Sequence, residues 1–277
     1  MGLESKVKLL LAGPGNAGRA LFRRISSSGH TIAGVAGRDP AVSAEAAADL
    51  SAPALGWDDP LPEADLVVIA VRDDAIGEVA VHLAPLAGEV RAAVHLSGLT
   101  SVEALEPMMG TCAIGSFHPL QTLPNPESGA ARLEGAWLAV TSDDDMLSDD
   151  LFRLARSIGA HPFELPDDSK ALYHAAAAAA ANYPLAALAM SRRLFEAAGV
   201  PFDAAGPLVR AVVDNALALG PEDALTGPIA RGDVGTVAGQ RAAVEAAVPE
   251  LVDDFLAMGR AVAGVCGTTD LFGEVLQ

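Results

Sequence analysis

Residues 7–19 read V-K-L-L-L-A-G-P-G-N-A-G-R, an apolar segment that runs into three glycines spaced as G-x-G-x-x-G. This spacing predicts a strand, a tight turn at Gly13 and a helix that Gly18 allows to pack closely on the strand. Gly15 lets the backbone approach a pyrophosphate, whose oxygens would accept from the unpaired N–H groups at the start of the helix. We therefore expect a dinucleotide to contact Gly13, Pro14, Gly15, Asn16, Ala17 and Gly18.

The identity of the dinucleotide depends on the end of the second predicted strand, residues 31–36. Asp or Glu at that point usually binds the ribose 2′-hydroxyl of NAD. This chain has Gly37 and Arg38 there, and a guanidinium suits a 2′-phosphate. Asp39 is still available as a ligand for NAD. We predict NADP as the cofactor, with NAD as the second choice, and Gly37 and Arg38 among its contacts.

Short apolar strands alternate with helix-length segments through the first part of the chain. We expect strands at 7–11, 31–36, 65–71, 92–96 and 113–117, then edge strands at 137–140 and 161–165 around a helix at 149–158. The alternation predicts an α/β fold with a Rossmann-like, doubly wound parallel sheet. After residue 165 the strand pattern stops, and helices are expected at 168–198, 204–219, 232–248 and 250–262. The predicted domains are therefore 1–165, which binds the nucleotide, and 166–277, which is all-helical.

The composition excludes several kinds of partner. The chain has 277 residues, 51% of them hydrophobic, and a formal net charge of −18. That charge would repel a polyphosphate backbone, so we expect no nucleic acid as a partner. The uncharged run at 171–190 is mostly alanine and is interrupted by Pro184, so we expect a buried helix and no membrane span. We find no signal peptide, disulfide framework or metal-ligand spacing, and expect a cytoplasmic protein without a metal.

Six motifs follow one another along nearly the full length of the chain. G-P-G-N-A-G-R at 13–19, V-V-I-A-V-R-D-D-A-I at 67–76 and H-L-S-G at 95–98 resemble the 6-phosphogluconate and β-hydroxyacid dehydrogenase superfamily. S-F-H-P-L-Q-T at 116–122, K-A-L-Y-H-A-A-A at 170–177 and L-T-G-P-I-A-R-G-D at 225–233 resemble one of its branches. That branch joins a Rossmann-like domain to a helical domain of unknown function, and some members act as an alternative ketopantoate reductase.

The resemblance implies where a cofactor would lie. In the superfamily the cofactor lies along the first glycine loop and along the turns after two later strands. Carried over, those turns are Val71, Arg72 and Asp73, and Ser97 and Gly98. The nicotinamide would then lie beside Ser97-Gly98 and face the helical domain. Relatives commonly dimerise through their helical domains, so the resemblance also implies a homodimer.

The catalytic helix of the superfamily often carries Lys-x-x-x-Asn, and this chain has Lys170-x-x-x-His174. Residues four apart lie about 40° from each other around a helix, so both could face one cleft. Lysine can polarise and protonate a carbonyl oxygen as hydride arrives at the carbon, and imidazole can donate, relay or orient. The replacement of Asn by His leaves open which of the two gives the proton.

Substrate contacts are expected from several further residues. His118 and Gln121 follow a strand, and the carboxyl ends of parallel strands face the ligand crevice. An H-P pair at a similar place occurs in prephenate dehydrogenases, which keeps that class open. Thr226-Gly227-Pro228 predicts a helix start, so that Arg231 and the helix N-terminus could bind a carboxylate. Ser97, Gly98 and Asn182, a polar group in an apolar helix, complete the predicted substrate site.

These features together predict an NADP-dependent oxidoreductase. It would reduce a small carboxylate-bearing ketone resembling ketopantoate, or an imine, by hydride transfer in the cleft between the domains. A prephenate dehydrogenase or a pyrroline-5-carboxylate reductase is the alternative among enzymes. A third reading is a sensor or scaffold that binds NADP(H) without turnover, because such a protein would need the glycine loop but not Lys170 or His174.

Overall fold

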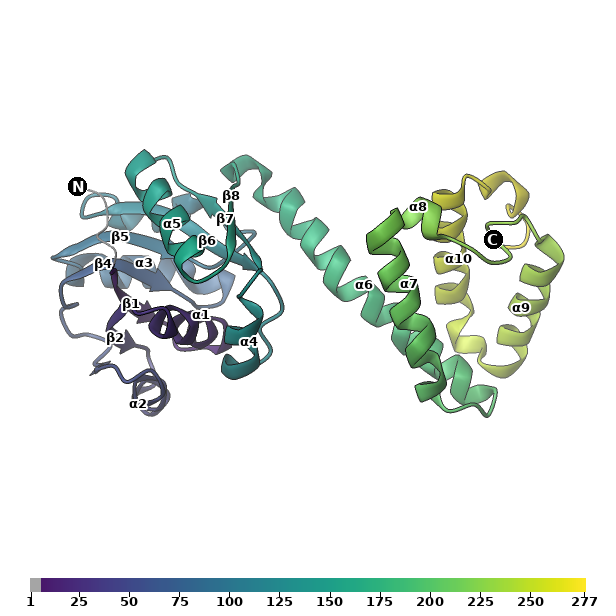
Figure 1. Cartoon of the computed structure of the whole chain (residues 1–277), viewed down its shortest axis with the longest axis horizontal. Helices are drawn as coiled ribbons and strands as arrows, with labels where there is room; N and C mark the ends of the chain where they lie inside the picture. The colour runs from purple at the N-terminus through teal and green to yellow at the C-terminus, as the bar shows by residue number, and fades with distance from the viewer. Residues whose placement is uncertain (1–5) are drawn as a thin grey trace. The chain divides into compact units, whose positions relative to one another are not determined.

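The computed structural model describes residues 6–277 (Figure 1). It divides into two compact units, Met1–Ala178 and Ala179–Gln277. The division falls within the long helix α6 (Lys170–Ala197), whose first residues hydrogen-bond to the sheet. The domain boundary predicted after residue 165 instead marks the end of the last strand. Because the start of α6 is bonded to the sheet, the site residues it carries can be described together with the first unit.

The first unit is built on one sheet of eight strands in the order β3-β2-β1-β4-β5-β6-β7-β8. The strands are β1 (Lys8–Ala12), β2 (Thr31–Ala36), β3 (Ala54–Leu55), β4 (Ala64–Ile69), β5 (Val90–His95), β6 (Ala113–Leu120), β7 (Trp137–Thr141) and β8 (His161–Glu164). All neighbours pair in parallel except β6 and β7. The prediction of a Rossmann-like, doubly wound sheet is confirmed.

The pairing of β6 with β7 departs from the predicted parallel sheet. Leu120, the last residue of β6, lies opposite Trp137, the first residue of β7, and the two strands run antiparallel. The connection contains α4 (Pro126–Arg132), which packs beside α1 and does not return the chain to the other end of the sheet. The chain therefore starts β7 at the end of the sheet where β6 stops, and β7 lies one strand in from the edge.

Two apolar layers cover the sheet. One face packs against α1 (Asn16–Ser27), α2 (Pro40–Asp49) and α5 (Asp145–Ser157), and the other against α3 (Ile76–Leu83) and a 3-10 helix, Val102–Met108. Alternate residues of the central strands supply both layers, as in β4, where Leu66 and Val68 face one and Val67 and Ile69 face the other. Helix α5 starts earlier than the predicted residue 149, because the side chain of Asp144 accepts from the Leu147 N–H and caps it.

The second unit is helical, as predicted. It contains the rest of α6, α7 (Gly206–Leu219), α8 (Pro221–Ala224), α9 (Val234–Ala247) and α10 (Val252–Cys266). Its buried core comes from α9, α10 and the C-terminal segment, and consists of Val237, Leu256, Ala263, Phe272 and Leu276. The helix predicted to start at Pro228 is wrong: residues 228–232 form a turn that ends at Gly232 with φ +69°, and α9 begins after Asp233. Among residues 6–277, no helix has the length and hydropathy needed to cross a bilayer.

Candidate functional site

The glycine loop lies between the end of β1 and the start of α1, and its three glycines have different surroundings. A Cβ on Gly13, which has φ +94°, would lie 2.5 Å from Val71 Cγ1, and one on Gly18 would lie 2.7 Å from Leu11 Cδ1. Packing within the protein therefore requires both glycines. A Cβ on Gly15 would meet nothing closer than the Ala70 carbonyl oxygen at 3.9 Å. The bare backbone at Gly15 faces open space, which fits the close approach of a pyrophosphate.

A hollow of about 360 Å³ adjoins this loop. It is lined by Gly13, Pro14, Gly15, Gly37, Arg38, Asp39, Val42, Trp57, Ala70, Val71, Arg72 and Val79. Seven of the residues predicted to bind the cofactor therefore line this hollow, and an eighth, Asp73, directly follows Arg72 in the chain. The remaining three, Asn16, Ala17 and Gly18, form the first turn of α1. The donors that a dinucleotide needs, a helix N-terminus and glycine backbone, are present here.

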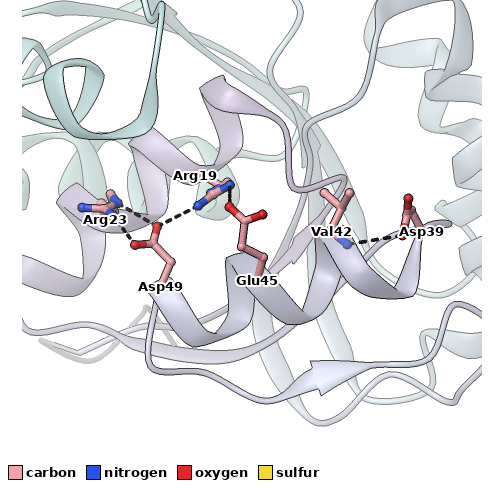
Figure 2. Close-up of polar contacts among 6 residues, drawn as sticks. All are labelled: Arg19, Arg23, Asp39, Val42, Glu45 and Asp49. Carbon is pink, nitrogen blue, oxygen red and sulfur yellow. Dashed lines mark hydrogen bonds and ion pairs between the residues drawn. The ribbon is translucent and has the colours of Figure 1, made fainter.

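Arg38 and Asp39 differ in how free they are to bind a ligand. The Asp39 carboxylate accepts from the N–H groups of Ala41 and Val42 and so caps α2 (Figure 2). Arg38 projects from the rim of the hollow and pairs only loosely with Glu78, at 3.6 Å. Its side chain is 64% exposed. The guanidinium is thus available for an anion, whereas the carboxylate already serves the helix.

Helix α2 is fixed on α1 by a group of ion pairs (Figure 2). Arg19 donates to Glu45 at 2.9 Å and to Asp49 at 3.4 Å, and Arg23 also pairs with Asp49. Burial acts to raise the pKa of Asp49, but the hydrogen bonds and charges of Arg23 and Arg19 together hold it below its usual value. Because Arg19 directly follows Gly18, these pairs connect the glycine loop to the helix that starts beside Arg38.

A second polar group lies at the carboxyl ends of β5 and β6. The Lys170 side chain is only 1% exposed, and its Nζ donates to the Ser97 carbonyl oxygen at 3.1 Å and to Ser116 Oγ at 2.7 Å. Burial lowers the Lys170 pKa to about 8, against the opposing charges of Asp167 and Asp73. Lys170, predicted as catalytic, is therefore an internal cation attached to the turn after β5.

The turn at Ser97 is held from several sides. Its N–H donates to His95 Nδ1 at 3.1 Å, and its hydroxyl donates to Asp73 Oδ2 at 2.8 Å. His95 is fully buried, and burial, then the charge of Lys170, lowers its pKa to about 3. Asp73 thus joins the turn after β4 to the turn after β5, the two places where the resemblance put a cofactor. His95 was not among the predicted site residues, although its position two residues before Ser97 could have indicated the role.

His118 is the half-buried side chain next to this turn. Its Nδ1 lies 2.8 Å from the Tyr173 hydroxyl, and a Cβ on Gly98 would lie 2.8 Å from its Cε1 and 2.9 Å from its Nε2. The face of the imidazole therefore packs on Gly98. Burial, then the charges of Lys170 and His174, lowers the His118 pKa to about 4. Burial raises the pKa of Tyr173 to about 12, so at neutral pH both groups are uncharged.

Tyr173 is the residue of this group that sequence analysis overlooked. It lies three residues after Lys170, a spacing that puts both on one side of α6, and its ring packs edge-on to Phe163 at 5.9 Å. The ring of His174, predicted as catalytic, lies 6.4 Å from that of His118.

The other predicted substrate residues are dispersed. Gln121 is exposed, and its side-chain oxygen accepts from the Thr122 N–H. Asn182 and Arg231 belong to the second unit, where both are exposed. The structure of the first unit therefore brings together Ser97, Gly98, His118, Lys170 and His174.

Comparison with known families gives a partial match. A family model for a domain of unknown function, DUF2520, matches residues 136–262. The matched segment starts one residue before β7, so that domain includes the last two strands of the sheet as well as helices. The resemblance in the sequence had implied a purely helical domain. No curated protein sequence matches the chain.

Solved structures match over almost the whole chain. A Bacteroides fragilis protein assigned as an NADP oxidoreductase, BF3122, has a TM-score of 0.78 at 19% identity and covers 94% of this chain and 99% of its own. Protein TM1727 from Thermotoga maritima has a TM-score of 0.71 at 25% identity, with 92% and 98% covered. A pyrroline-5-carboxylate reductase from Coxiella burnetii has a TM-score of 0.58 at 17% identity, with 96% and 98% covered. The fold of this chain is that of NADP oxidoreductases and reductases.

Proposed function

We propose that the chain is an NADP-dependent oxidoreductase that reduces a small carboxylate-bearing ketone or an imine. The observation that carries the proposal is the bond between Ser97 and Asp73, 2.8 Å long, which ties the nucleotide-binding turns to the Lys170 and His118 group. A ligand bound along Gly15 and the turn after β4 would extend toward Ser97-Gly98. There it would meet uncharged imidazole and a buried cation, groups suited to an oxygen that gains negative charge.

The cofactor preference rests on Arg38. Its guanidinium is exposed beside the hollow and held only by Glu78, at 3.6 Å, while Asp39 is engaged as a helix cap, so the site favours a 2′-phosphate over a 2′-hydroxyl. Arg72, beside the same hollow, is 83% exposed and pairs with Asp74 at 3.1 Å, so it is a second guanidinium that a phosphate could recruit from an exposed ion pair. A bound NADPH would supply the hydride. The residues of this chain hold the two nucleotide ends, exclude water around Ser97 and stabilise charge on the substrate oxygen.

The substrate class comes from the residues around His118 and from the relatives. Ketopantoate, a small keto acid, follows from the branch that the motifs resemble, and Arg231, Gln121 and Asn182 are the proposed contacts to its carboxylate and hydroxyl. An imine is the second candidate, since pyrroline-5-carboxylate reductases and a reductive aminase from Aspergillus terreus share the fold. The prephenate class depends on the H-P pair at His118 alone. Turnover with each substrate separates the three.

A homodimer is the proposed assembly. Helix α7 contributes no side chain to the buried core of residues 6–277, although it carries five large apolar residues that are at least half exposed. These are Leu208, Val212, Val213, Leu217 and Leu219. Exposed apolar side chains on more than one side of a helix normally mean that another element covers it. A second copy of the chain would cover it, as obligate dimers do with interfaces that resemble a core.

The experiment that tests the function is a fluorescence titration with NADPH and NADH, followed on the same sample by an absorbance assay with ketopantoate. Tight binding of NADPH and its oxidation in the presence of ketopantoate are the expected results. Replacement of Lys170 by Met should remove turnover and leave nucleotide binding intact. Binding without turnover on any keto acid or imine would favour the sensor, and lack of binding to either nucleotide would refute the proposal.

A further inference from the structure

We propose that His118 gives the proton to the substrate oxygen and that Tyr173 is the positioning residue that makes this possible. The inference rests on the proposed function and names the proton donor that the sequence left open between Lys170 and His174. It depends on two contacts of His118: one of its nitrogens faces a hydroxyl, and the face of its ring packs on Gly98.

The first contact decides which nitrogen of His118 carries hydrogen. A phenol that keeps its proton donates it to the nearest acceptor, and His118 Nδ1 lies 2.8 Å from the Tyr173 oxygen. Nδ1 is then the acceptor, and the hydrogen of the neutral imidazole is on Nε2. Pro119 restricts the backbone of His118 to an extended conformation, which limits the ways the ring can turn. Tyr173 thus selects the tautomer.

The second contact places the ring. A Cβ on Gly98 would lie 2.8 Å from Cε1, 2.9 Å from Nε2 and 3.0 Å from Nδ1 of His118, so the face of the imidazole packs on this residue. Nε2 therefore lies beside the turn where the proposed function puts the reacting carbon, with its hydrogen in the plane of the ring. Any larger residue at position 98 would push the ring away, so glycine is required here for the imidazole to reach the turn.

Lys170 is poorly placed to be the donor. It is 1% exposed and its ammonium already donates to Ser97 and Ser116, so a substrate could reach it only by displacing these bonds. Its charge still acts on the neighbouring groups through the low-dielectric interior. His174 shows only an edge-on ring contact to His118, at 6.4 Å. His118 is the titratable group with both a fixed tautomer and a place beside Gly98.

Hydride adds to the carbonyl carbon, and the electron pair of the C=O π bond moves to the oxygen. The Nε2–H bond of His118 breaks as the new O–H bond forms, while the Tyr173 proton moves to Nδ1. Water returns a proton to the Tyr173 oxygen. NADPH is the reductant and water the proton source, so His118 ends neutral with its hydrogen on Nδ1 and exchanges back with solvent.

The tautomer is measured directly by nitrogen-15 NMR of the histidine side chains on the ligand-free protein. The H118Q variant assigns the His118 signals among those of the six histidines. In the native protein we expect Nδ1 to be unprotonated and Nε2 protonated. In the Y173F variant, which removes one oxygen and keeps the ring on Phe163, the two nitrogens should exchange between tautomers. Protonated Nδ1 in the native protein, or an unchanged tautomer in Y173F, would overturn the inference.

Steady-state kinetics of the same variants provide a second test of the inference. H118Q should lower kcat by about 10²–10⁴-fold, the usual contribution of a positioned acid, with the Kd for NADPH changed less than about twofold. Y173F should lower kcat by about tenfold or more, because loss of the group that fixes a histidine tautomer is costly. The matched control is Y183F, which removes the only other tyrosine hydroxyl, at a residue 67% exposed on α6.

These outcomes separate the inference from the proposed function. If NADPH binds and a substrate turns over while H118Q retains the native kcat, His118 is not the donor although the oxidoreductase stands. If neither nucleotide binds, the oxidoreductase falls, and with it the proton transfer, whatever tautomer the NMR shows.

Discussion

Lys170 reaches from the first turn of α6 to the backbone carbonyl of Ser97, which its Nζ meets at 3.1 Å. The contact attaches a helix of 28 residues to the turn after β5. A buried cation gives up its hydration, and apolar residues of similar volume often replace buried charges without loss of stability. A charge retained here, beside Ser97 and Ser116, is therefore better explained by the electrostatics of the site than by stability.

The cost of this buried charge should appear as a pH-dependent difference between the native protein and K170M. The Lys170 pKa is about 8 when folded and 10.5 when exposed, so the unfolded chain holds more protons between these values. Stability of the native protein should therefore rise with pH across this window, by about 3 kcal/mol in full. K170M lacks that gain. Urea unfolding at pH 7 and pH 10, followed by the fluorescence of the two tryptophans, measures this difference in stability. An equal change of stability with pH in the native protein and in K170M would contradict the prediction.

His95 and His118 predict a loss of stability in acid, with the same sign as for Lys170, because stability again rises with pH. Their pKa values are about 3 and about 4 in the folded protein against 6.5 when exposed, so the unfolded chain binds more protons below pH 6.5. Folding should lose about 2 kcal/mol for each histidine between pH 6.5 and pH 5. The groups that act on His118 are Lys170, His174 and Asp73. H118Q should therefore lose less stability in acid than the native protein, because it lacks one of the two histidines.

The control for that measurement is H161Q, because His161 is exposed on β8. Its unfolding midpoint should follow the native protein at both pH values. An H118Q variant that is just as acid-sensitive as the native protein would show that His118 becomes charged in the folded state.

Local patterns were sufficient to predict much of the fold. The stretch at 31–36 is a strand with the predicted bounds, and the glycine loop lies between a strand and a helix, because both depend on nearest neighbours and on backbone geometry. The antiparallel β7 was not predictable in the same way. Its direction depends on α4 packing beside α1, a contact between residues more than a hundred positions apart.

The candidate site was likewise predictable only in part from the sequence. Lys170 was found from its spacing to His174, and His118 from the strand predicted at 113–117, although β6 continues past His118 to Leu120. Tyr173 was missed because its role is set by a partner distant in the sequence: it meets His118, which is 55 residues away. His95 was missed although its partner, Ser97, is only two residues away. An alanine-rich helix offers no local signal for which of its polar residues faces the sheet. Burial of Lys170 likewise follows from the sheet beneath it and not from its neighbours in the chain.

The glycine loop offers a matched pair of variants. G18A should lower the free energy of unfolding by about 1–3 kcal/mol, since its Cβ would lie 2.7 Å from Leu11 and 2.8 Å from Ala70. G15A should fold normally, because its φ of −77° suits alanine and its Cβ has room. Its Kd for NADPH should nevertheless rise by about tenfold or more, or about 1.4 kcal/mol. Thermal unfolding and nucleotide titration separate the effects, and a G15A variant with native affinity would place the pyrophosphate elsewhere.

The apolar surface of α7 predicts the oligomeric state. Light scattering should give twice the 28.1 kDa mass of one chain, and L217E should shift the native dimer to monomer because a charge would be buried at the interface. Leu217 is 84% exposed in a single chain. V81E is the matched control, since Val81 is also exposed but lies on α3 in the first unit. A native monomer at micromolar concentration would contradict the prediction, as would a V81E variant that dissociates equally.

Arg38 predicts the nucleotide preference. A guanidinium that donates to a phosphate contributes about 1.5–3 kcal/mol, so R38A should weaken NADPH binding by about tenfold to a hundredfold. NADH lacks the 2′-phosphate and should bind R38A as it binds the native protein. E78Q is the control: it releases Arg38 from its 3.6 Å partner without removing the guanidinium, so NADPH affinity should be kept or increased. Equal losses for NADPH and NADH in R38A would instead mean that Arg38 supports the fold of the loop, and the preference would have to come from Arg72.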